Sequence, residues 1–228
     1  MRRTRFFAIG LAGAGCAAFE NWSRRTRATS NEKHRPLPGD GLVARPMWEA
    51  TRAITIHASR ETVWPWLVQM AYPTHRAGWY TPHWIDRLIF GIRAQSADRI
   101  VPELQDLSPG DRVPDSPDAV VAYFTVAEIV KNQALVLISH THPLPIYRDV
   151  DFSWAFALED LGADTRLIMR ARARYAPVGP APIIRLLIAV GFGIGDVVQA
   201  GAMLAGIAAR AECRPDGVDT AVQSAGSG

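Results

Sequence analysis

The strongest constraint on the fold is a pair of alternating runs between Val150 and Tyr175. Successive side chains of a strand point to opposite faces, so each run presents one mostly apolar face. The residues on these faces are Val150, Phe152, Trp154, Phe156 and Leu158 in the first run, and Leu167, Met169, Ala171, Ala173 and Tyr175 in the second. The short polar turn between the runs, Gly162 to Asp164, predicts an antiparallel hairpin.

Side-chain size and charge predict the register of this hairpin. If Leu158 faces Leu167, large residues meet small ones on the apolar face, and opposite charges meet on the other face, where such pairs are mildly favourable. The remaining pairs in this register are Trp154–Ala171, Phe152–Ala173, Glu159–Arg166 and Asp151–Arg174. We therefore expect a single domain with one wet and one covered face, whose apolar interior is either filled or holds a small ligand.

Composition sets broad limits on the class of protein. The chain has 228 residues, 48% hydrophobic and 21% charged, which suits one globular domain with a tail at each end. The net charge is +3 and no basic block lies outside the N-terminus, so no nucleic-acid partner is expected. Two cysteines, Cys16 and Cys213, are too few for a disulfide framework or a cysteine-rich metal site.

Residues 1–28 have the pattern of a signal or anchor segment. Arg2, Arg3 and Arg5 precede an apolar run from Phe6 to Phe19, which is shorter than a membrane-spanning helix and within the range of a signal-peptide core. The pattern is similar to a twin-arginine leader, and residues 13–16 resemble a lipobox. We expect export or membrane attachment through the N-terminus. The alternatives are an uncleaved N-terminal anchor or a mis-assigned start with Met47 as the true beginning, and a cytoplasmic location is the alternative to export. Residues 29–46 are predicted to be a linker.

The other elements follow in order along the chain. A strand is expected from Thr51 to Ala58 and a helix from Ser59 to Met70, with Pro65 inside it. A second short helix is expected between Trp79 and Phe90, with Trp84, Leu88 and also Ile85 turned inward. The later elements are a hairpin of residues 120–130 and 134–141 whose faces the alternation does not assign, a helical stretch of residues 183–212, and a disordered tail, 213–228.

At this point the residues also carry a family resemblance over residues 47–212. The chain resembles a START-like protein of the SRPBCC superfamily, in particular the bacterial members loosely called polyketide cyclase/dehydrase-like. The similar segments are TRAITIHASRETVWPWLVQM, AGWYTPHWIDRL, SADRIVPELQDLSPGDRVP, FTVAEI, ALVL, SWAFALEDLGADTRLIMRAR and MLAGIAARAE. The resemblance implies an α+β helix-grip fold: a curved antiparallel sheet around a long C-terminal helix, with two short helices after the first strand and a cavity for a hydrophobic molecule. It implies no common reaction.

Candidate ligand-binding residues come from two stretches of the chain. Five aromatic residues suit the wall of such a cavity or simply fill the core: Trp79, Tyr80, Trp84, Trp154 and Phe156. Asp86 and Arg99 lie in segments that resemble the family patterns GWY-x-x-x-W-x-D and SADRI. They would either orient a ligand or serve a structural role as an ion pair or loop cap.

Three polar groupings have a second interpretation. His140 and His142 share a strand face, but spacing fixes no third ligand, so no metal site is predicted. His83 and Asp86 could act as a general acid/base pair, although a solvated pair on an exposed helix is the simpler interpretation. Arginines 166, 170, 172 and 174 form a ladder at strand spacing, interpreted as a solvated outer face rather than a site for phosphate or anionic membrane.

The sequence contains no GxxxxGK[ST], GxGxxG after a strand, GxSxG or HExxH, so no cofactor is expected and a standard enzyme is not indicated. We favour a binding protein for a small hydrophobic ligand such as a lipid, isoprenoid or polyketide. The first alternative is a cyclase or dehydratase in which Asp86, His83 or Arg99 moves a proton. The second is a membrane-associated protein with residues 183–209 in the bilayer, which Arg185 and Asp196 argue against.

Overall fold

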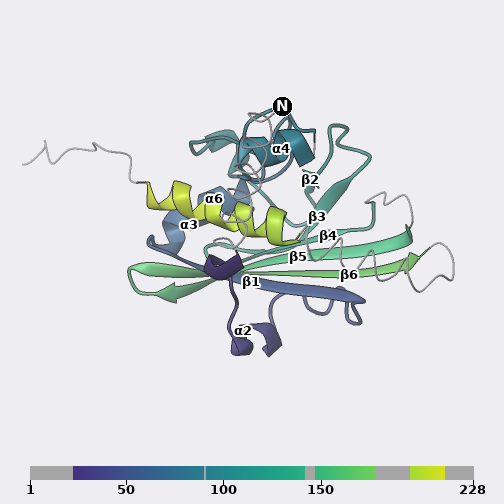
Figure 1. The fold of residues 1–228 in the computed structure, drawn as a ribbon, viewed down its shortest axis with the longest axis horizontal. Helices are drawn as coiled ribbons and strands as arrows, with labels where there is room; N and C mark the ends of the chain where they lie inside the picture. Colours follow the sequence, from purple (N-terminus) through teal and green to yellow (C-terminus); the bar gives the residue numbers. More distant parts are fainter. Residues whose placement is uncertain (1–22, 90, 142–146, 178–195, 214–228) are drawn as a thin grey trace, which may run out of the picture.

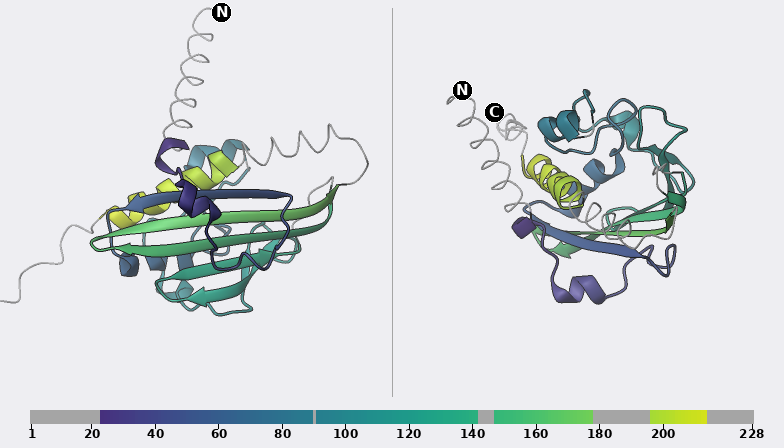
Figure 2. Two further views of the ribbon diagram at one scale, coloured as in Figure 1. Left: turned by 90° about the horizontal axis from the view of Figure 1, so that it is seen from below. Right: turned by 45° about the vertical axis from the view of Figure 1, so that its right-hand side comes forward.

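The computed structural model describes residues 23–89, 91–141, 147–177 and 196–213. These residues form a six-stranded antiparallel sheet in the order β1-β6-β5-β4-β3-β2. The strands are β1 (Trp48–Ile56), β2 (Arg112–Pro114), β3 (Tyr123–Val130), β4 (Ala134–Ser139), β5 (Tyr147–Leu161) and β6 (Asp164–Pro177). The sheet curves strongly, and Figure 2 shows its concave side facing α3 and α6.

Helices lie on both sides of this sheet. The C-terminal helix α6 contacts β1 and α3 on the concave side, whereas α2 lies on the convex side (Figures 1 and 2). The helical elements are α2 (Ser30–His34), α3 (Arg60–Val68), α4 (His83–Ile89), the 3-10 turn η1 (Pro102–Leu104), the π-helical turn η2 (Asp196–Ala200) and α6 (Gly201–Glu212). This arrangement confirms the predicted α+β helix-grip architecture. None of the helices within the described ranges is both long and apolar enough to cross a lipid bilayer.

The hairpin of β5 and β6 has the predicted register. Leu158 pairs with Leu167, Trp154 with Ala171 and Phe152 with Ala173, and the charged pairs Glu159–Arg166 and Asp151–Arg174 fall opposite each other as expected. The turn between the strands places Gly162 at φ +81°, a conformation that glycine adopts without strain. The inward residues Trp154, Phe156, Leu158, Leu167 and Met169 are all buried.

A β-bulge explains why the alternation in β3 was ambiguous. The register between β3 and β4 shifts between Val126 and Glu128, so the inward face changes parity within the strand. Phe124 and Val126 are buried before the shift, and Ile129 packs against the core after it. A two-residue period that assigns the inward face correctly in one half of β3 therefore assigns the wrong face in the other half.

The two short helices match the sequence differently. In α3, Val63, Trp66 and Leu67 are buried as predicted, and the carbonyl of Ser59 accepts the first helical N–H groups without a side-chain cap. In α4, Ile85 is fully buried, but Trp84 and Leu88 are 48% and 75% exposed, so their predicted inward orientation was wrong. Ile85 and Asp86 therefore form the buried face of α4.

The segment 29–46, predicted as a linker, is instead packed on the convex face of the sheet. Thr29 and Glu32 form a reciprocal capping box at the start of α2, with the Thr29 N–H donating to Glu32 Oε2 at 2.6 Å. Ala28 and Leu37 are buried in one cluster with Ala53, Ala157 and Ile168 of the sheet. The physical reason is that the convex face carries apolar side chains, which are stabilised by removal from water, and arginines, which need hydrogen-bond acceptors.

The arginine ladder is the second reason for this cover. Arg170 is only 3% exposed, and its guanidinium donates five hydrogen bonds to acceptors in the N-terminal segment and β1. The acceptors are Thr51 Oγ1 at 3.0 Å, Asp40 Oδ2 at 2.7 Å, and the carbonyl oxygens of Glu32 at 2.7 Å, Lys33 at 3.0 Å and Arg35 at 3.0 Å. The interpretation as a solvated face is thus wrong for Arg170 and holds for the exposed Arg174, which pairs with Asp151.

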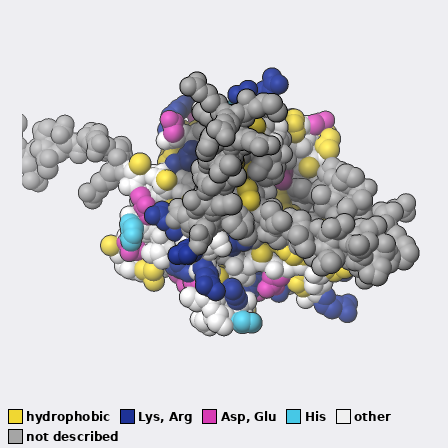
Figure 3. All heavy atoms as spheres, in the orientation of Figure 1, with side chains coloured by type: hydrophobic (Ala, Val, Ile, Leu, Met, Phe, Trp, Pro, Cys, Tyr) yellow, Lys and Arg dark blue, Asp and Glu magenta, His cyan; other side chains and the backbone are white. Residues whose placement is uncertain are grey.

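A basic groove of about 700 Å³ lies beside this cover, and Figure 3 shows Lys and Arg side chains gathered near α2. Its cationic lining residues are Arg24, Arg27, Lys33 and Arg52. The carboxylate of Glu49, which also lines it, is engaged by Arg172 at 2.6 Å. The groove has the charge to attract anions, but surface arginines alone define no particular ligand.

The stability of the fold should depend on Glu32 in acid. Its hydrogen bond from Arg166, at 2.7 Å, holds the pKa of Glu32 at about 2 against an ordinary 4.5, although burial acts in the opposite direction. Because the folded pKa is depressed, the stabilisation is complete above about pH 4.5 and is lost as the pH falls towards 2. Its full size is on the order of 3 kcal/mol.

We therefore expect E32Q to lower the free energy of unfolding in urea at pH 7, and the difference from the wild type to shrink as the pH approaches 2. The exposed carboxylate of Glu103 supplies the control variant, E103Q, which should match the wild type throughout. A difference between E32Q and the wild type that is the same at pH 7 and pH 3 would contradict the assignment.

Candidate ligand-binding site

An aromatic cluster covers the concave face of the sheet. Its rings come from β5, from β3 and from the loop before α4, because alternation turns every second residue of β5 to this face. The centroids of Trp79 and Trp154 lie 5.4 Å apart, and Trp154 lies 5.5 Å from Phe156 and 5.8 Å from Phe124. Trp79, Trp154 and Phe156 are 3%, 5% and 0% exposed, so the structure brings together these three predicted site residues.

Two polar atoms in this cluster have no partner. The indole Nε1 atoms of Trp79 and Trp154 are buried, and neither N–H finds a hydrogen-bond acceptor among the described residues. Leaving a buried donor unsatisfied costs about 1–3 kcal/mol, and native proteins rarely retain such groups without a reason. The cluster is therefore a buried apolar region that contains two donors without acceptors among the described residues.

Tyr80 lies next to Trp79 and is held in a strained conformation. Its φ is +60°, which is uncommon for a non-glycine residue, although only 1% of the residue is exposed. The phenol donates to the carbonyl of Trp66 at 3.0 Å, and the backbone N–H donates to Ser96 Oγ at 3.0 Å. Burial raises the pKa of the phenol, so it remains a neutral donor. Such strain costs of order 1–3 kcal/mol and is concentrated at functional sites.

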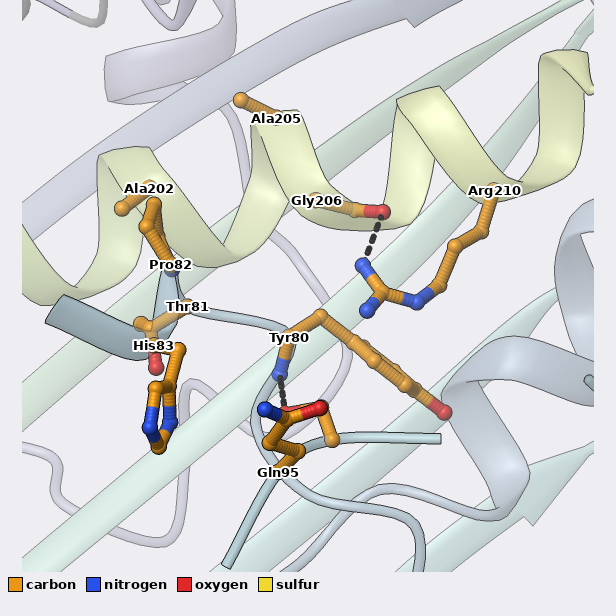
Figure 4. A pocket seen from close by; sticks show the side chains of 10 residues that line it. Tyr80, Thr81, Pro82, His83, Gln95, Ala202, Ala205, Gly206 and Arg210 are labelled. Carbon is orange, nitrogen blue, oxygen red and sulfur yellow. Dashed lines mark hydrogen bonds between the residues drawn. The ribbon is translucent and has the colours of Figure 1, made fainter. Parts of the chain in front are cut away.

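The backbone of Tyr80 forms one wall of a cleft of about 380 Å³ between α6 and the loop before α4. Figure 4 shows Arg210 and His83 at opposite ends of this cleft, with Tyr80 between them. Helix α6 approaches closely at Gly206, where a Cβ atom would overlap the carbonyl oxygen of Tyr80. The lining residues are Tyr80, Thr81, Pro82, His83, Gln95, Ser96, Ala202, Ala205, Gly206 and Arg210.

His83, which lines this cleft, and Asp86, which does not, both lie in the first turn of α4. Asp86 is 4% exposed and accepts a short hydrogen bond from Thr81 Oγ1. Burial raises the pKa of Asp86, while the hydrogen bond from Thr81 acts against the rise. The Nδ1 atom of His83 is buried and has no partner among the described residues. The interpretation of the two residues as a solvated, exposed pair was therefore wrong.

Two other predicted site residues lie apart from the cluster and the cleft. The side chain of Arg99 is exposed, and only its carbonyl has a positioning role, as the acceptor for Gln69 Nε2 at 3.1 Å. Trp84 projects from the exposed side of α4. His140 Nδ1 donates to Asp151 Oδ1 at 2.8 Å, and His142 lies outside the described residues. Across the described ranges, no three acidic, histidine or cysteine side chains lie close enough to hold a metal ion.

Sequence reasoning missed three residues of this region. Phe124 was hidden by the bulge in β3, which broke the two-residue period. Gly206 sits among the alanines of a helix rich in small residues, so nothing in its neighbourhood marks a backbone contact. Arg210 lies in the last turn of α6, where a basic residue is expected simply to complement the helix dipole.

Comparison with known proteins gives likeness of overall shape only. No family model matches the chain, and no curated protein matches it. A structure from Mesorhizobium loti is 17% identical, with a TM-score of 0.42 over 72% of this chain and 96% of that one. A structure from Nitrosomonas europaea is 15% identical, with a TM-score of 0.41 over 77% and 98%, and Ara h 8.0201 is 13% identical, with a TM-score of 0.35 over 69% and 98%. No ligand or activity is carried over from them.

The contact between Gly206 and Tyr80 can be tested directly. We expect G206A to lower the free energy of unfolding by about 1–3 kcal/mol and Tm by several degrees, because the new methyl group meets backbone that cannot rotate away. At Gly41 an added Cβ has open space, so G41A should change the free energy by less than about 0.5 kcal/mol. Equal Tm values for the two variants in calorimetry would refute the close approach.

Proposed function

We propose that this protein binds a small, mainly hydrophobic molecule against the aromatic cluster on the concave face of its sheet. The observation that carries the proposal is the pair of buried, unpartnered indole N–H groups of Trp79 and Trp154. Filling a core requires no such donors, and apolar residues would do it at lower cost. A ligand with an oxygen acceptor explains them. The ligand class is a lipid, isoprenoid or polyketide, and the chain would then be a START-like member of the SRPBCC superfamily.

The energetics support binding of this kind. Burial of about 300 Å² of apolar ligand surface contributes roughly 7 kcal/mol at about 25 cal/mol per Å², before the cost of immobilising the ligand is subtracted. Hydrogen bonds to the two indoles would add to this and would fix the orientation of the ligand. Because Trp79, Trp154 and Phe156 are 3%, 5% and 0% exposed, a ligand reaches them only by displacing residues packed over them, and the gain from apolar burial has to exceed that cost.

Removing one indole N–H should weaken the binding. We expect native mass spectrometry of the full chain, purified from the producing cells, to show a hydrophobic molecule at near-unit stoichiometry. The W154F variant should bind that molecule about tenfold more weakly, because the hydrogen bond and part of the ring contact are lost. The same change at the exposed Trp84, W84F, is the control and should leave occupancy unchanged. Equal occupancy in both variants would argue against a site at the aromatic cluster.

A second function, a cyclase or dehydratase acting on a polyketide-like substrate, is favoured by one observation. Asp86 is a buried carboxyl with a raised pKa, and it lies one helical turn from the unpartnered Nδ1 of His83. A carboxyl that keeps its proton to higher pH is suited to general acid catalysis.

The two functions differ in their response to substitution of Asp86. An enzyme should lose about 100-fold or more of its turnover in D86N while it keeps its ligand affinity, because proton transfer alone is removed. A carrier should keep both ligand affinity and ligand transfer in D86N. Turnover of candidate polyketide substrates, measured for the wild type and D86N, distinguishes the two functions. If the wild type shows no turnover, the enzyme function is refuted.

Export, or attachment to a membrane through residues 1–28, stays a prediction from the arginines and the apolar run of that segment. Within the described part of the chain, the basic groove includes Arg24 and Arg27, at the end of this segment, together with Lys33 and Arg52. A positively charged surface of this kind would be attracted to the anionic lipids of a membrane leaflet.

A further inference from the structure

We infer that the cleft between α6 and the Tyr80–His83 turn binds the carboxylate of the ligand, so that the ligand class is an amphipathic acid. The inference rests on the proposed function, because it assigns a second polar group, a carboxylate, to a molecule whose other oxygen accepts from the indoles of Trp79 and Trp154 and whose apolar part lies on the aromatic cluster. The two sites adjoin at consecutive residues. The ring of Trp79 belongs to the cluster, whereas Tyr80 lines the cleft.

The charge of the cleft selects an anion. Among its ten lining residues, Arg210 is the one with a permanent charge, and no carboxylate lines it. No acidic side chain of the described ranges lies within ion-pair distance of Arg210. The carboxyl group of Asp86 is turned to Thr81, and Asp86 is not among the residues that line the cleft. A guanidinium without a counter-ion in a partly enclosed cleft is suited to bind an anion.

Arg210 is also held in a fixed orientation. Its Nε donates to the carbonyl of Ala97 at 2.8 Å and its Nη1 to the carbonyl of Gly206 at 3.1 Å. The guanidinium lies 4.9 Å from the centroid of the Tyr80 ring, a cation–π contact that fixes its plane. These contacts leave Nη2 without an acceptor among the described residues. A pre-oriented guanidinium edge is complementary to the two oxygens of a carboxylate.

His83 lines the opposite end of the cleft, and its Nδ1 atom is buried without a hydrogen-bond partner among the described residues. Figure 4 shows the small side chains of Pro82 and Ala202 between the His83 end and the body of α6. The cleft thus has a cationic end at Arg210 and a polar end at His83, with apolar contacts beside them. At about 380 Å³ the cleft is at the small end of the range for pockets that hold small molecules, so a ligand with a longer chain extends beyond it. The aromatic cluster is adjacent at Trp79.

The test is isothermal titration calorimetry of the full chain, in buffer without detergent, with decanoate, decanol and decyl phosphate below their micelle-forming concentrations. We expect decanoate to bind the wild type about tenfold or more tightly than decanol, since a hydrogen-bonded charge pair supports a difference of that size. R210Q should reduce the affinity for decanoate to that for decanol and leave decanol unchanged. R112Q is the matched control, because Arg112 also stacks on a tyrosine, 4.6 Å from the Tyr123 ring, but lies away from the cleft.

Each result has a separate meaning. If the wild type binds decanoate and decanol equally, the carboxylate site is refuted and the hydrophobic site stands; if it binds none of the three, the proposed function itself fails. Tighter binding of decyl phosphate than of decanoate would overturn the carboxylate in favour of a phosphate head group. Should R210Q unfold, R210K, which keeps the charge but not the planar fork, should show an intermediate preference for decanoate. An unchanged preference in a folded R210K or R210Q would overturn the role of Arg210.

Discussion

The pairing of β5 with β6 fixes both faces of the sheet at once. With Trp154 opposite Ala171 and Phe156 opposite Met169, the large rings turn to the concave side, and the arginines of β6 necessarily turn to the convex side. A slip of one residue would exchange the two sets completely. It would put guanidinium groups into the core and the aromatic rings against the N-terminal segment. The aromatic cluster and the charged outer layer are therefore two consequences of one register.

The outer layer in turn makes the N-terminal segment part of the domain. A buried guanidinium is tolerated only if its donors are satisfied, and Arg170 finds three of its five acceptors in the backbone carbonyls of residues 32–35. Every residue has a backbone carbonyl, so the sequence does not show which of them accept hydrogen bonds. The prolines and glycines of residues 36–41 therefore favoured the prediction of a linker. One readable signal was present: Thr29 and Glu32 have the spacing of a capping box, which marks a helix start where a linker was expected.

The sequence predicted what depends on local periodicity and pairing chemistry. The register of the β5–β6 hairpin and the buried positions of α3 follow from side-chain size and alternation alone, and both were correct. The faces of β3 and the orientation of α4 were not predictable in this way. A bulge adds one residue to a strand without a distinctive residue type, and a seven-residue helix is too short for its apolar stripe to identify its buried side. Tyr80 was identified as a candidate by its aromatic side chain. Its contact with Gly206 could not be predicted, because it joins two segments that are far apart in the sequence.

The site combines three features that each oppose folding. Two indole N–H groups are buried without acceptors, Tyr80 has φ +60°, and α6 is in contact with the Tyr80 carbonyl at a position where only glycine fits. Together they cost several kcal/mol, a large part of the 5–15 kcal/mol that stabilises a typical domain. Simple substitutions, such as phenylalanine for either tryptophan, would remove part of this cost. The clustering of all three around one turn, between the aromatic cluster and the cleft, favours a constraint from ligand binding, because a core selected for stability alone has no need of them.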